Sequence, residues 1–315
     1  MSEKNNNLAF VFPGQGSQSI GMLTELAESF PEVNQIFNNA SEVLEKDLWS
    51  LVSNGPAEDL NQTYNTQPAM LAAGVSVWQV WCKKSSFRPG WMAGHSLGEY
   101  TALVCSGALS FTDAIALVAE RGRLMQEAVP VGTGAMAAIL GLNDDQVASV
   151  CAEAADGEVV SPVNFNAPGQ VVIAGNISAV ERAMVAAKDA GAKRAVKLPV
   201  SVPSHCALMK PAAEKLDGQM EKIHFDQPDL KLLHNVDVAI HTNPGQIRTA
   251  LKEQLYQPVR WVDTIQFMHE QGVSHFLECG PGKVLAGLNR RIVKAAEHMT
   301  DFNPDTLENA MEQLE

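Results

Sequence analysis

The chain has 315 residues, of which 46% are hydrophobic and 19% charged, so it can bury a large core. Its net charge of −13, from 23 Lys and Arg against 36 Asp and Glu, argues against a general nucleic-acid binder. No apolar run reaches the ~18 residues of a membrane span, and the polar start MSEKNNN lacks the apolar segment of a signal peptide.

The spacing of cysteines and histidines bears on compartment and on metal binding. Five cysteines are scattered without a C-x-x-C pair, which is typical of reduced thiols in the cytosol. The eight histidines show no H-E-x-x-H or comparable spacing. We therefore expect a cytoplasmic protein without a metal site.

The first expected element is a buried strand over 8–12, which leads into the glycine-rich turn "PGQGSQSIG". A phosphate-binding loop is one interpretation, yet Gly21 comes two positions too late for G-x-G-x-x-G, and the Gly-Lys-Ser/Thr ending of a P-loop is absent. The turn places Gln15 between two glycines at the carboxyl end of a strand, where open α/β sheets bind ligands. Whether these glycines serve a ligand or only a tight turn stays open at this point.

Strands alternate with amphipathic helices along the rest of the chain, which predicts an α/β sheet fold. A long, mostly buried helix is expected over 67–82, with Thr66 as its N-cap. A short strand over 91–93 enters "GHSLGEY", and Ser110 with Asp113 forms a capping-box pair for the next helix. Late in the chain, "SHFLECGPGKVL" predicts a strand, a Gly-Pro-Gly turn and a final helix.

The middle of the chain follows the order β-α-β-β-α-β, which is the ferredoxin-like arrangement. It lies between the hinge-like stretches "VPVGTG" and "LPVSVPSH". We expect a small subdomain over 132–199, inserted into a larger α/β body made of 1–131 and 200–315. Its elements are expected over 134–141, 143–155, 158–165, 170–174, 178–190 and 194–200.

Gly94-His95-Ser96-Leu97-Gly98 matches G-x-S-x-G between an expected strand and an expected helix, which is the context of a nucleophile elbow. The glycines allow a sharp turn that projects the Ser96 hydroxyl above a helix N-terminus. The backbone N–H of Leu97 is then placed to stabilise an oxyanion. The alternative is a chance match in a loop.

A nucleophilic serine needs a base, and His205 in "VPVSVPSHCALMKPA" is the candidate. It lies where the chain re-enters the main body, and loops at strand ends commonly carry catalytic residues. A capping or surface role is the alternative for His205, and it fits His224, His269 and His298 better.

Arg121 gives the clue to the substrate. The helix "SFTDAIALVAERGRLMQEA" carries an apolar stripe with i, i+3, i+4 spacing, and Arg121 lies on that stripe, whereas Glu120 and Arg123 lie off it. A buried guanidinium needs a carboxylate or phosphate partner. Either an internal salt bridge or a carboxylate on the substrate would supply one.

Taken together, these residues make the chain resemble the malonyl-CoA:acyl-carrier-protein transacylases of fatty acid synthesis. The resemblance runs from about Leu8 to Lys294, and only the tail from about Ala295 is uninformative. It implies an α/β hydrolase-like body with a parallel sheet and a ferredoxin-like insert, in agreement with the division above. The blocks that carry it are "FPGQGSQ", "TQPA", "GHSLGEY", "ERGRLMQ", "NAPGQVVIAG", "VPSHCALMKPA", "QLYQPVRW" and "ECGPGKVLAGL".

The resemblance also implies the roles of single residues. Ser96 matches the nucleophile, His205 its base, and Arg121 the residue that binds the free malonyl carboxylate. The backbone carbonyl of Gln254 matches the group that orients the histidine, and no acidic residue has a context that requires it to do so. The expected site is thus a Ser-His dyad supported by the main chain.

The resemblance assigns the oxyanion hole to the backbone N–H groups of Gln15 and Leu97, so the opening glycines would serve a carbonyl and no phosphate. It implies malonyl-CoA and acyl carrier protein as partners, transfer through a malonyl-serine, and no metal or redox cofactor. We expect a monomer with no nucleic-acid or membrane partner. Candidates for docking an acidic carrier protein, any of which could simply be solvated surface charge, are Lys193, Arg194, Lys283, Arg290, Arg291 and Lys294.

Two rival functions remain on the sequence alone. A serine esterase or thioesterase of the α/β-hydrolase class would share Ser96, but it would place an acid and then a histidine late in the chain and would not need Arg121. A non-catalytic carrier-protein binder that kept the fold is a rival of a different class. The presence of both Ser96 and His205 argues against it.

Overall fold

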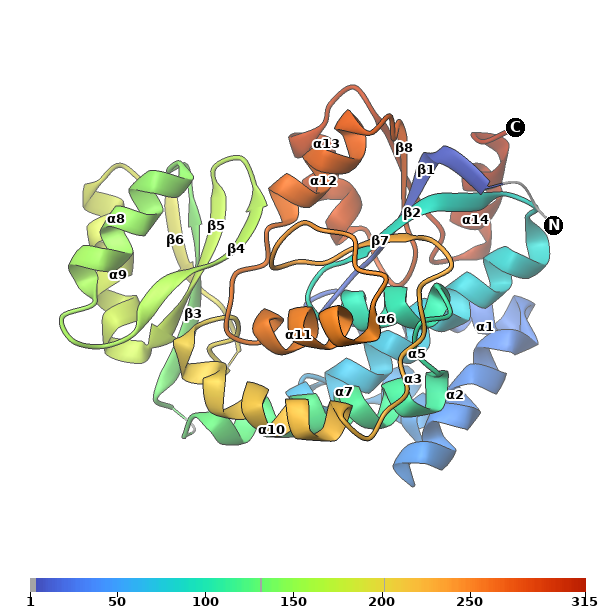
Figure 1. Ribbon diagram of the computed structural model, residues 1–315, viewed down its shortest axis with the longest axis horizontal. Coiled ribbons are helices and arrows are strands. Elements are labelled where there is room, and N and C mark those ends of the chain that lie inside the picture. Colours follow the sequence, from blue (N-terminus) through green and yellow to red (C-terminus); the bar gives the residue numbers. More distant parts are fainter. Residues whose placement is uncertain (1–3, 131, 201) are drawn as a thin grey trace.

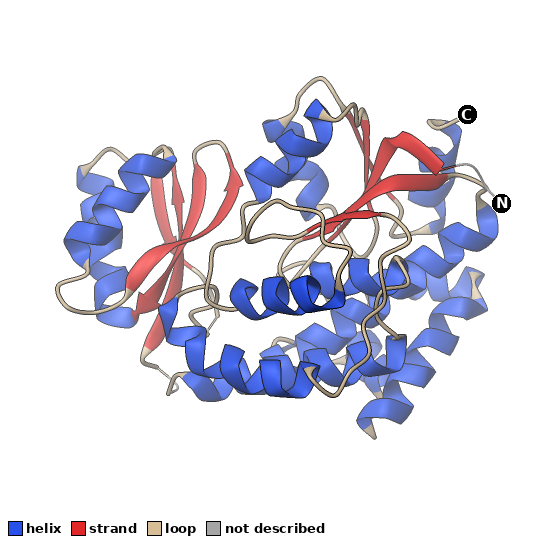
Figure 2. Ribbon diagram, viewed as in Figure 1, coloured by secondary structure: helices blue, strands red, loops and turns tan. Residues whose placement is uncertain are grey.

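The computed structural model describes residues 4–130, 132–200 and 202–315, which form a mixed α/β fold with two separate sheets (Figure 1, Figure 2). The larger sheet is parallel, with the strand order β7-β2-β1-β8-β9. Parallel neighbours need crossover connections, which here are helical. The strands are β1 (Lys4–Phe12), β2 (Arg88–Gly94), β7 (Lys231–Leu233), β8 (His275–Glu278) and β9 (Glu297–Thr300).

Helices cover both faces of the parallel sheet (Figure 1). The longest, α5, is buried nearly all round because it packs between α2 and α7. The N-cap of α7 is Ser110, whose Oγ accepts from the Asp113 N–H as predicted. The reciprocal bond of a capping box is not seen in the described residues, because the Asp113 carboxylate accepts from Ser110 Oγ and not from the Ser110 N–H. Among the described helices, none combines the length and apolarity that crossing a membrane requires. The helices of this body are α1 (Thr24–Ser29), α2 (Pro31–Leu44), α3 (Leu48–Asn54), α4 (Ala57–Leu60), α5 (Thr63–Lys84), α6 (Gly98–Cys105), α7 (Phe111–Ala128), the 3₁₀ turn Ala207–Met209, α10 (Lys210–Met220), α11 (Pro244–Gln254), α12 (Trp261–Glu270), α13 (Val284–Ile292) and α14 (Pro304–Glu312).

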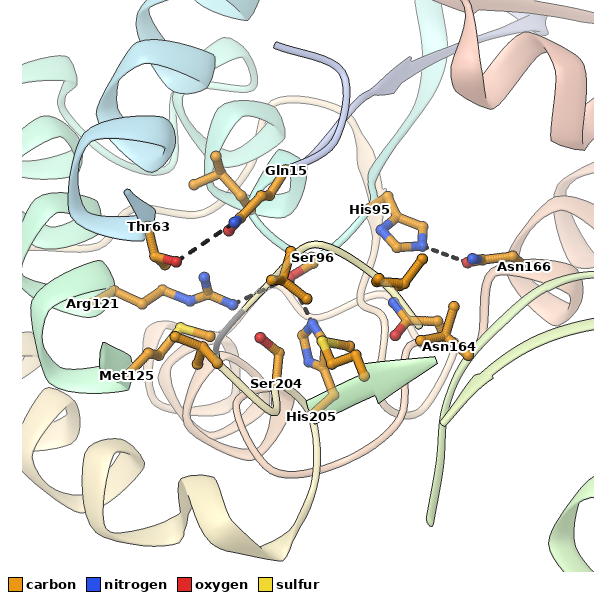
Figure 3. A pocket seen from close by; sticks show the side chains of 16 residues that line it. Gln15, Thr63, His95, Ser96, Arg121, Met125, Asn164, Asn166, Ser204 and His205 are labelled. Carbon is orange, nitrogen blue, oxygen red and sulfur yellow. Dashed lines mark hydrogen bonds between the residues drawn. The ribbon is translucent and has the colours of Figure 1, made fainter. Parts of the chain in front are cut away.

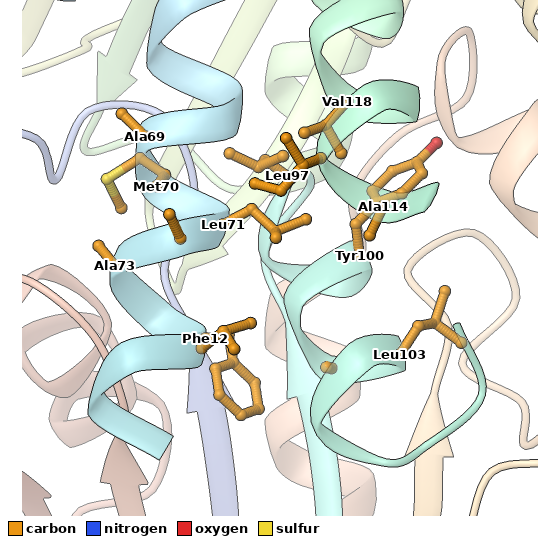
Figure 4. Packing of buried hydrophobic residues seen from close by; sticks show 14 of the residues in the cluster. Phe12, Ala69, Met70, Leu71, Ala73, Leu97, Tyr100, Leu103, Ala114 and Val118 are labelled. Atoms are coloured by element: carbon orange, nitrogen blue, oxygen red, sulfur yellow. The ribbon is translucent and has the colours of Figure 1, made fainter. Parts of the chain in front are cut away.

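Strand β1 lies at the centre of the parallel sheet and divides its side chains between two hydrophobic cores. Leu8, Phe10 and Phe12 belong to the larger core, which Figure 4 shows packed between α5, α6 and α7. Ala9 and Val11 point to the opposite face, into a core shared with α12 and α13. A central strand of a parallel sheet has no solvent face, which explains why the sequence is a continuous apolar run.

The second sheet is antiparallel, with the order β4-β5-β3-β6. Two helices pack on one of its faces through a core of their own. At the β4 edge of this sheet, the Phe165 N–H donates to the Val259 carbonyl at 3.0 Å, which joins the sheet to the body. The elements are β3 (Gly134–Leu140), α8 (Asp144–Ala154), β4 (Val160–Ala167), β5 (Gln170–Asn176), α9 (Ile177–Asp189) and β6 (Arg194–Lys197).

All six elements expected over 134–200 are present, with ends displaced by at most three residues. Two other expectations are wrong. Thr66 is not an N-cap, because α5 begins one turn earlier and the Thr66 hydroxyl donates to the Leu60 carbonyl at 2.6 Å. The helix after the Gly-Pro-Gly turn is not the final one, since β9 then completes the sheet edge and α14 follows. Val131 and Ser201, at the two expected junctions, lie outside the described residues.

Candidate active site

Ser96 lies on a sharp turn between β2 and α6, at the carboxyl end of the parallel sheet. Its φ of 51° is left-handed, which non-glycine residues rarely adopt. A Cβ on Gly94 would lie 1.9 Å from the Gly98 backbone, and a Cβ on Gly98 would lie 2.0 Å from the Phe12 carbonyl oxygen. The turn is therefore so tight that only glycine fits on either side of the serine. This is the geometry expected of the G-x-S-x-G match.

The Ser96 hydroxyl meets His205, with 2.8 Å between Ser96 Oγ and His205 Nε2 (Figure 3). The other ring nitrogen, Nδ1, lies 2.6 Å from the backbone carbonyl oxygen of Gln254. Since a carbonyl only accepts, Nδ1 carries the hydrogen and Nε2 presents its lone pair to the serine. The backbone N–H of His205 also donates to the Leu255 carbonyl at 2.9 Å. One short segment of chain thus fixes both the position and the tautomer of the ring.

His205 is 3% exposed, and its environment disfavours the charged imidazolium. Burial, followed by the positive charge of Arg121, lowers its pKa to about 3, although the Gln254 carbonyl opposes the shift. The ring is therefore neutral at physiological pH and free to accept a proton.

The Arg121 side chain extends from α7 to the Ser96 hydroxyl. It is 1% exposed, as its position on the apolar stripe predicts. Its Nη2 lies 3.3 Å from Ser96 Oγ and 3.0 Å from Gln254 Oε1, and its Nη1 donates to Gln67 Oε1 at 2.8 Å. The guanidinium also lies over the ring of Tyr100, at 5.4 Å from its centroid.

The internal salt bridge that the sequence left open for Arg121 is not seen: no carboxylate in the described part of the chain lies within 4.0 Å of its guanidinium nitrogens. Its hydrogen-bond partners are neutral, namely two amide oxygens and the Ser96 hydroxyl, and its Nε has no partner in the same residues. Burial lowers the pKa of Arg121, yet a guanidinium stays protonated in proteins. A buried positive charge therefore faces the serine without a protein anion in contact with it.

The opening loop lies directly against the elbow. A Cβ on Gly14 would lie 2.4 Å from the His95 carbonyl oxygen and 3.7 Å from the Leu97 nitrogen. The backbone N–H groups of Gln15 and Leu97 make no hydrogen bond to any described residue. Two free donors beside the nucleophile could hold a negatively charged oxygen.

The cavity around Ser96 lies between the two sheets (Figure 3). The second sheet contributes Met136, Asn164 and Val172 to its wall. Also in the wall of the cavity, His95 Nε2 lies 2.8 Å from the Asn166 side-chain oxygen, and burial lowers the pKa of His95. Ligands would therefore contact both parts of the molecule. None of the described His, Cys, Asp and Glu side chains cluster in threes as a metal site would require.

Sequence reasoning missed a buried polar cluster beneath the elbow. Asn235 Oδ1 accepts from the Ser96 N–H at 2.8 Å, and Asn235 Nδ2 donates to the Gly94 carbonyl at 2.7 Å. Because the Ser96 N–H already donates to Asn235, it is not available to an oxyanion, whereas the Leu97 N–H is. Asn235 lies two residues after the apolar run "LKLL", close to the end of β7, and that place after a strand was the signal available in the sequence.

The remaining sequence candidates do not line the cavity around Ser96. His224, His269 and His298 make local contacts, to Asp226 and to the backbone carbonyls of Val273 and Val293. The basic docking candidates are all exposed; among them, Arg291 reaches the second sheet, where it donates to Pro168 and Gln170, and Arg290 donates to the His298 carbonyl. These six residues are Lys193, Arg194, Lys283, Arg290, Arg291 and Lys294.

Residues 9–306 match the family model described as an acyl transferase domain. The chain is 57% identical over 304 residues to the malonyl CoA-acyl carrier protein transacylase of Escherichia coli, covering 96% of this chain and 98% of that protein. An acyl carrier protein S-malonyltransferase from Vibrio cholerae is similar in structure, with a TM-score of 0.94, 57% identity, and 96% and 99% of the two chains covered. A malonyl-transacylase solved in complex with its type II PKS acyl-carrier protein is also similar in structure, with a TM-score of 0.96 and 56% identity. The match covers 98% of this chain and 99% of that chain.

Proposed function

The chain belongs to the acyl transferase family, among the malonyl-CoA:acyl-carrier-protein transacylases, and from this premise we propose how its site works. We infer that it moves the malonyl group of malonyl-CoA to the pantetheine thiol of an acyl carrier protein through an ester on Ser96, and so supplies fatty acid elongation. One observation carries this proposal: His205 Nε2 and Arg121 Nη2 converge on Ser96 Oγ, at 2.8 and 3.3 Å. A base and a cation at one hydroxyl suit a nucleophile for an anionic acyl group.

In the first half-reaction, Ser96 Oγ attacks the thioester carbon of malonyl-CoA while His205 Nε2 takes the hydroxyl proton. The new carbon–oxygen bond turns the carbonyl oxygen into an oxyanion, which the N–H groups of Gln15 and Leu97 stabilise. The carbon–sulfur bond then breaks, and His205 returns its proton to the leaving sulfur. The products are malonyl-Ser96 and free CoA.

The second half-reaction runs the same steps in reverse with a different thiol. The pantetheine thiol gives its proton to His205 and attacks the ester carbon, and the same two N–H groups hold the oxyanion. The carbon–oxygen bond breaks, and Ser96 Oγ takes the proton back from His205. The malonyl group leaves as a thioester of the carrier protein.

Arg121 selects the acyl group in this scheme. Its guanidinium can form a bidentate pair with the free carboxylate of malonyl, which acetyl lacks. The absence of a contacting carboxylate among the described residues supports this role, because the buried charge then gains its anion from the substrate. Specificity thus follows from charge at the far end of the acyl group.

The rival functions fit the site less well. An α/β-hydrolase esterase orients its histidine with an acid, whereas His205 Nδ1 faces the Gln254 carbonyl oxygen. An esterase would also have no use for a buried guanidinium beside its nucleophile. A non-catalytic binder does not need the Ser96–His205 hydrogen bond.

The domain arrangement and the docking face are part of the proposal. We propose that 132–199 is a ferredoxin-like subdomain inserted into an α/β hydrolase-like body made of 1–131 and 200–315. The strand order of the antiparallel sheet, with both helices on one face, supports this description. An acidic carrier protein would dock on exposed basic residues, and Arg291, which links α13 to the second sheet, is one candidate. That the enzyme works as a cytoplasmic monomer stays a prediction.

The covalent intermediate provides the test. The protein is incubated with malonyl-CoA, and the intact mass and the acylated peptide are then determined by mass spectrometry. One malonyl group is expected on the peptide that contains Ser96, none in Ser96→Ala, and a normal adduct in the control Ser204→Ala, which alters another hydroxyl of the cavity. An adduct on Cys206 would overturn the assignment, but burial raises the pKa of that thiol to about 11 and leaves it a poor nucleophile.

A further inference from the structure

Glu99 is a fully buried carboxylate beneath the nucleophile, in the first turn of α6. Its Oε1 accepts from His234 Nδ1 at 2.7 Å. Its Oε2 accepts from the Asn235 N–H at 3.0 Å and from Gln254 Nε2 at 2.9 Å. Both carboxylate oxygens are therefore used, and neither contacts the cavity. The reaction described above gives this residue no role.

The contact with Gln254 matters because it decides which way that amide points. Gln254 Nε2 has two acceptors, Glu99 Oε2 and the Ser96 carbonyl oxygen, at 2.9 and 3.0 Å. On the opposite side, Gln254 Oε1 accepts from Arg121 Nη2 at 3.0 Å. Arginine can only donate and a carboxylate can only accept, so the reversed amide would face like groups on both sides. The orientation of the amide thus follows from the chemistry of its neighbours.

Gln254 also connects the two groups that the proposed reaction needs. Its side-chain oxygen holds the guanidinium of Arg121, and its backbone carbonyl holds the imidazole of His205. Gln254 is itself fully buried at the end of α11, so its side chain has few other partners. A residue that fixes the Gln254 amide therefore also fixes the acceptor that aims Arg121.

We propose that Glu99 is a positioning residue for acyl specificity: by holding the Gln254 amide with its oxygen toward Arg121, it aims the guanidinium at the free carboxylate of the acyl group. This inference rests on the proposed function of Arg121. Glu99 touches neither substrate nor the reacting atoms, and its effect passes through Gln254. This role does not depend on the charge of Glu99. It requires a hydrogen-bond acceptor at the position of Oε2.

Two substitutions separate contact from charge. Glu99→Gln can keep an oxygen against Gln254 while losing the charge, since His234 can turn its neutral ring nitrogen into an acceptor for the new amide. Glu99→Asp keeps the charge but withdraws the oxygens from Gln254 by one methylene. The measured quantity is the ratio of kcat/KM for malonyl-CoA to kcat/KM for acetyl-CoA, with the melting temperature of each variant.

Glu99→Asp should lower this ratio about tenfold, the effect of one lost hydrogen bond to a charged group. Glu99→Gln should keep the ratio within about threefold of the wild-type value, because the hydrogen bond to Gln254 is retained. The matched control is His234→Asn. It changes the hydrogen-bond partner of Glu99 Oε1, which does not contact Gln254, and it should leave the ratio unchanged. A counter-charge role for Glu99 predicts the opposite order of the two Glu99 variants.

A double-mutant cycle tests the route through Gln254. In a Gln254→Met background there is no amide to orient, so Glu99→Asp should then change the ratio by less than about twofold. Equal loss toward both acyl donors in Glu99→Asp, or the same loss of ratio in the Gln254→Met background, would overturn the inference. Failure of the proposed function looks different, because wild type would then show no malonyl-Ser96 and no preference for malonyl-CoA.

Discussion

Ser96 and His205 meet through a 2.8 Å hydrogen bond although both hold a left-handed backbone, with φ of 51° and 64°. Each such residue costs on the order of 1–3 kcal/mol, so the surrounding contacts must impose it. For Ser96 these contacts are the Asn235 side chain on its N–H and the Gln254 side chain on its carbonyl oxygen. For His205 it is the Leu255 carbonyl. The local strain is thus the condition for bringing the two side chains together.

This strain can be measured in the elbow itself. Ser96→Ala and Ser96→Gly both remove the hydroxyl, so both should be inactive, but only glycine relieves the left-handed backbone. Ser96→Gly should be more stable than Ser96→Ala by about 1 kcal/mol. The urea midpoints of the two variants provide the comparison, and equal midpoints would mean that the turn is not strained.

Gly14 gives a test of the oxyanion hole that leaves both donors in place. A methyl group there would lie 2.4 Å from the His95 carbonyl oxygen, so the loop must move away from the elbow and carry the Gln15 N–H with it. Gly14→Ala should lower kcat by at least about tenfold, and up to the ~10³-fold loss known for one oxyanion donor, with little change in KM.

The control for Gly14→Ala is Gly287→Ala in α13, where an added Cβ meets nothing within 4 Å. That variant should keep the wild-type kcat. If Gly14→Ala also kept it, the Gln15 N–H would not be part of the hole.

The sequence predicts the groups whose role follows from local pattern. Ser96 is identified by a strand, two glycines and a helix within a few residues, and these features are all local. Arg121 is identified by the phase of one helix, and its 1% exposure confirms that it faces inward. The bounds of elements are predicted less well, because the hydrophobic pattern fades at element ends. At the start of α5, the Thr66 hydroxyl donates to the Leu60 carbonyl six residues earlier, a contact that no periodicity marks.

The polar cluster under the elbow could not be found in this way. Glu99 contacts Asn235 and Gln254 from positions more than a hundred residues apart in the chain, and no periodicity relates them. Each is an ordinary polar residue until the fold brings α6, the segment after β7 and the end of α11 together. The strand β9 was missed for a similar reason, since four residues at the edge of a sheet carry too little pattern to stand out.

The low pKa of His205 predicts an unusual pH profile. Burial and then the charge of Arg121 lower this pKa to about 3, so lowering the pH from 8 to 5 leaves the free enzyme's base unprotonated. The kcat/KM for malonyl-CoA should therefore show no acid limb near the ordinary histidine value of about 6.5. A limb with its midpoint near that value would mean that His205 is not the base or that its site is solvated.

The same shift makes stability depend on pH. Between its unfolded pKa near 6.5 and the folded value of about 3, the unfolded chain binds a proton at His205 that the folded chain does not. The stability is therefore full above that range and decreases as the pH falls through it. Urea midpoints at pH 7 and pH 5 should show this loss, and it should be smaller in His205→Gln, whose side chain does not titrate.

Arg121 offers the sharpest test of what the site is for. If its partner is the malonyl carboxylate, Arg121→Ala should lower the ratio of malonyl to acetyl kcat/KM by at least about tenfold, because acetyl-CoA never used the contact. Arg121→Lys should recover little, because an ammonium cannot reproduce the bidentate fork. Arg123→Ala is the matched control, since Arg123 lies on the same helix but pairs with Glu120 and Glu127 at the surface.

The alternative for Arg121 is a purely structural role, which predicts a different result from a role in binding the malonyl carboxylate. Its contacts with Gln67, Gln254, Ser96 and the Tyr100 ring are all with neutral groups, so removing the side chain should cost stability through these contacts and the cavity left behind. A structural role would lower the melting temperature and the rates toward both acyl donors in equal proportion. An unchanged ratio in a destabilised Arg121→Ala would therefore refute selection by charge. A collapsed ratio in a variant that still forms acetyl-Ser96 would instead mean that the buried cation is there for the substrate's anion.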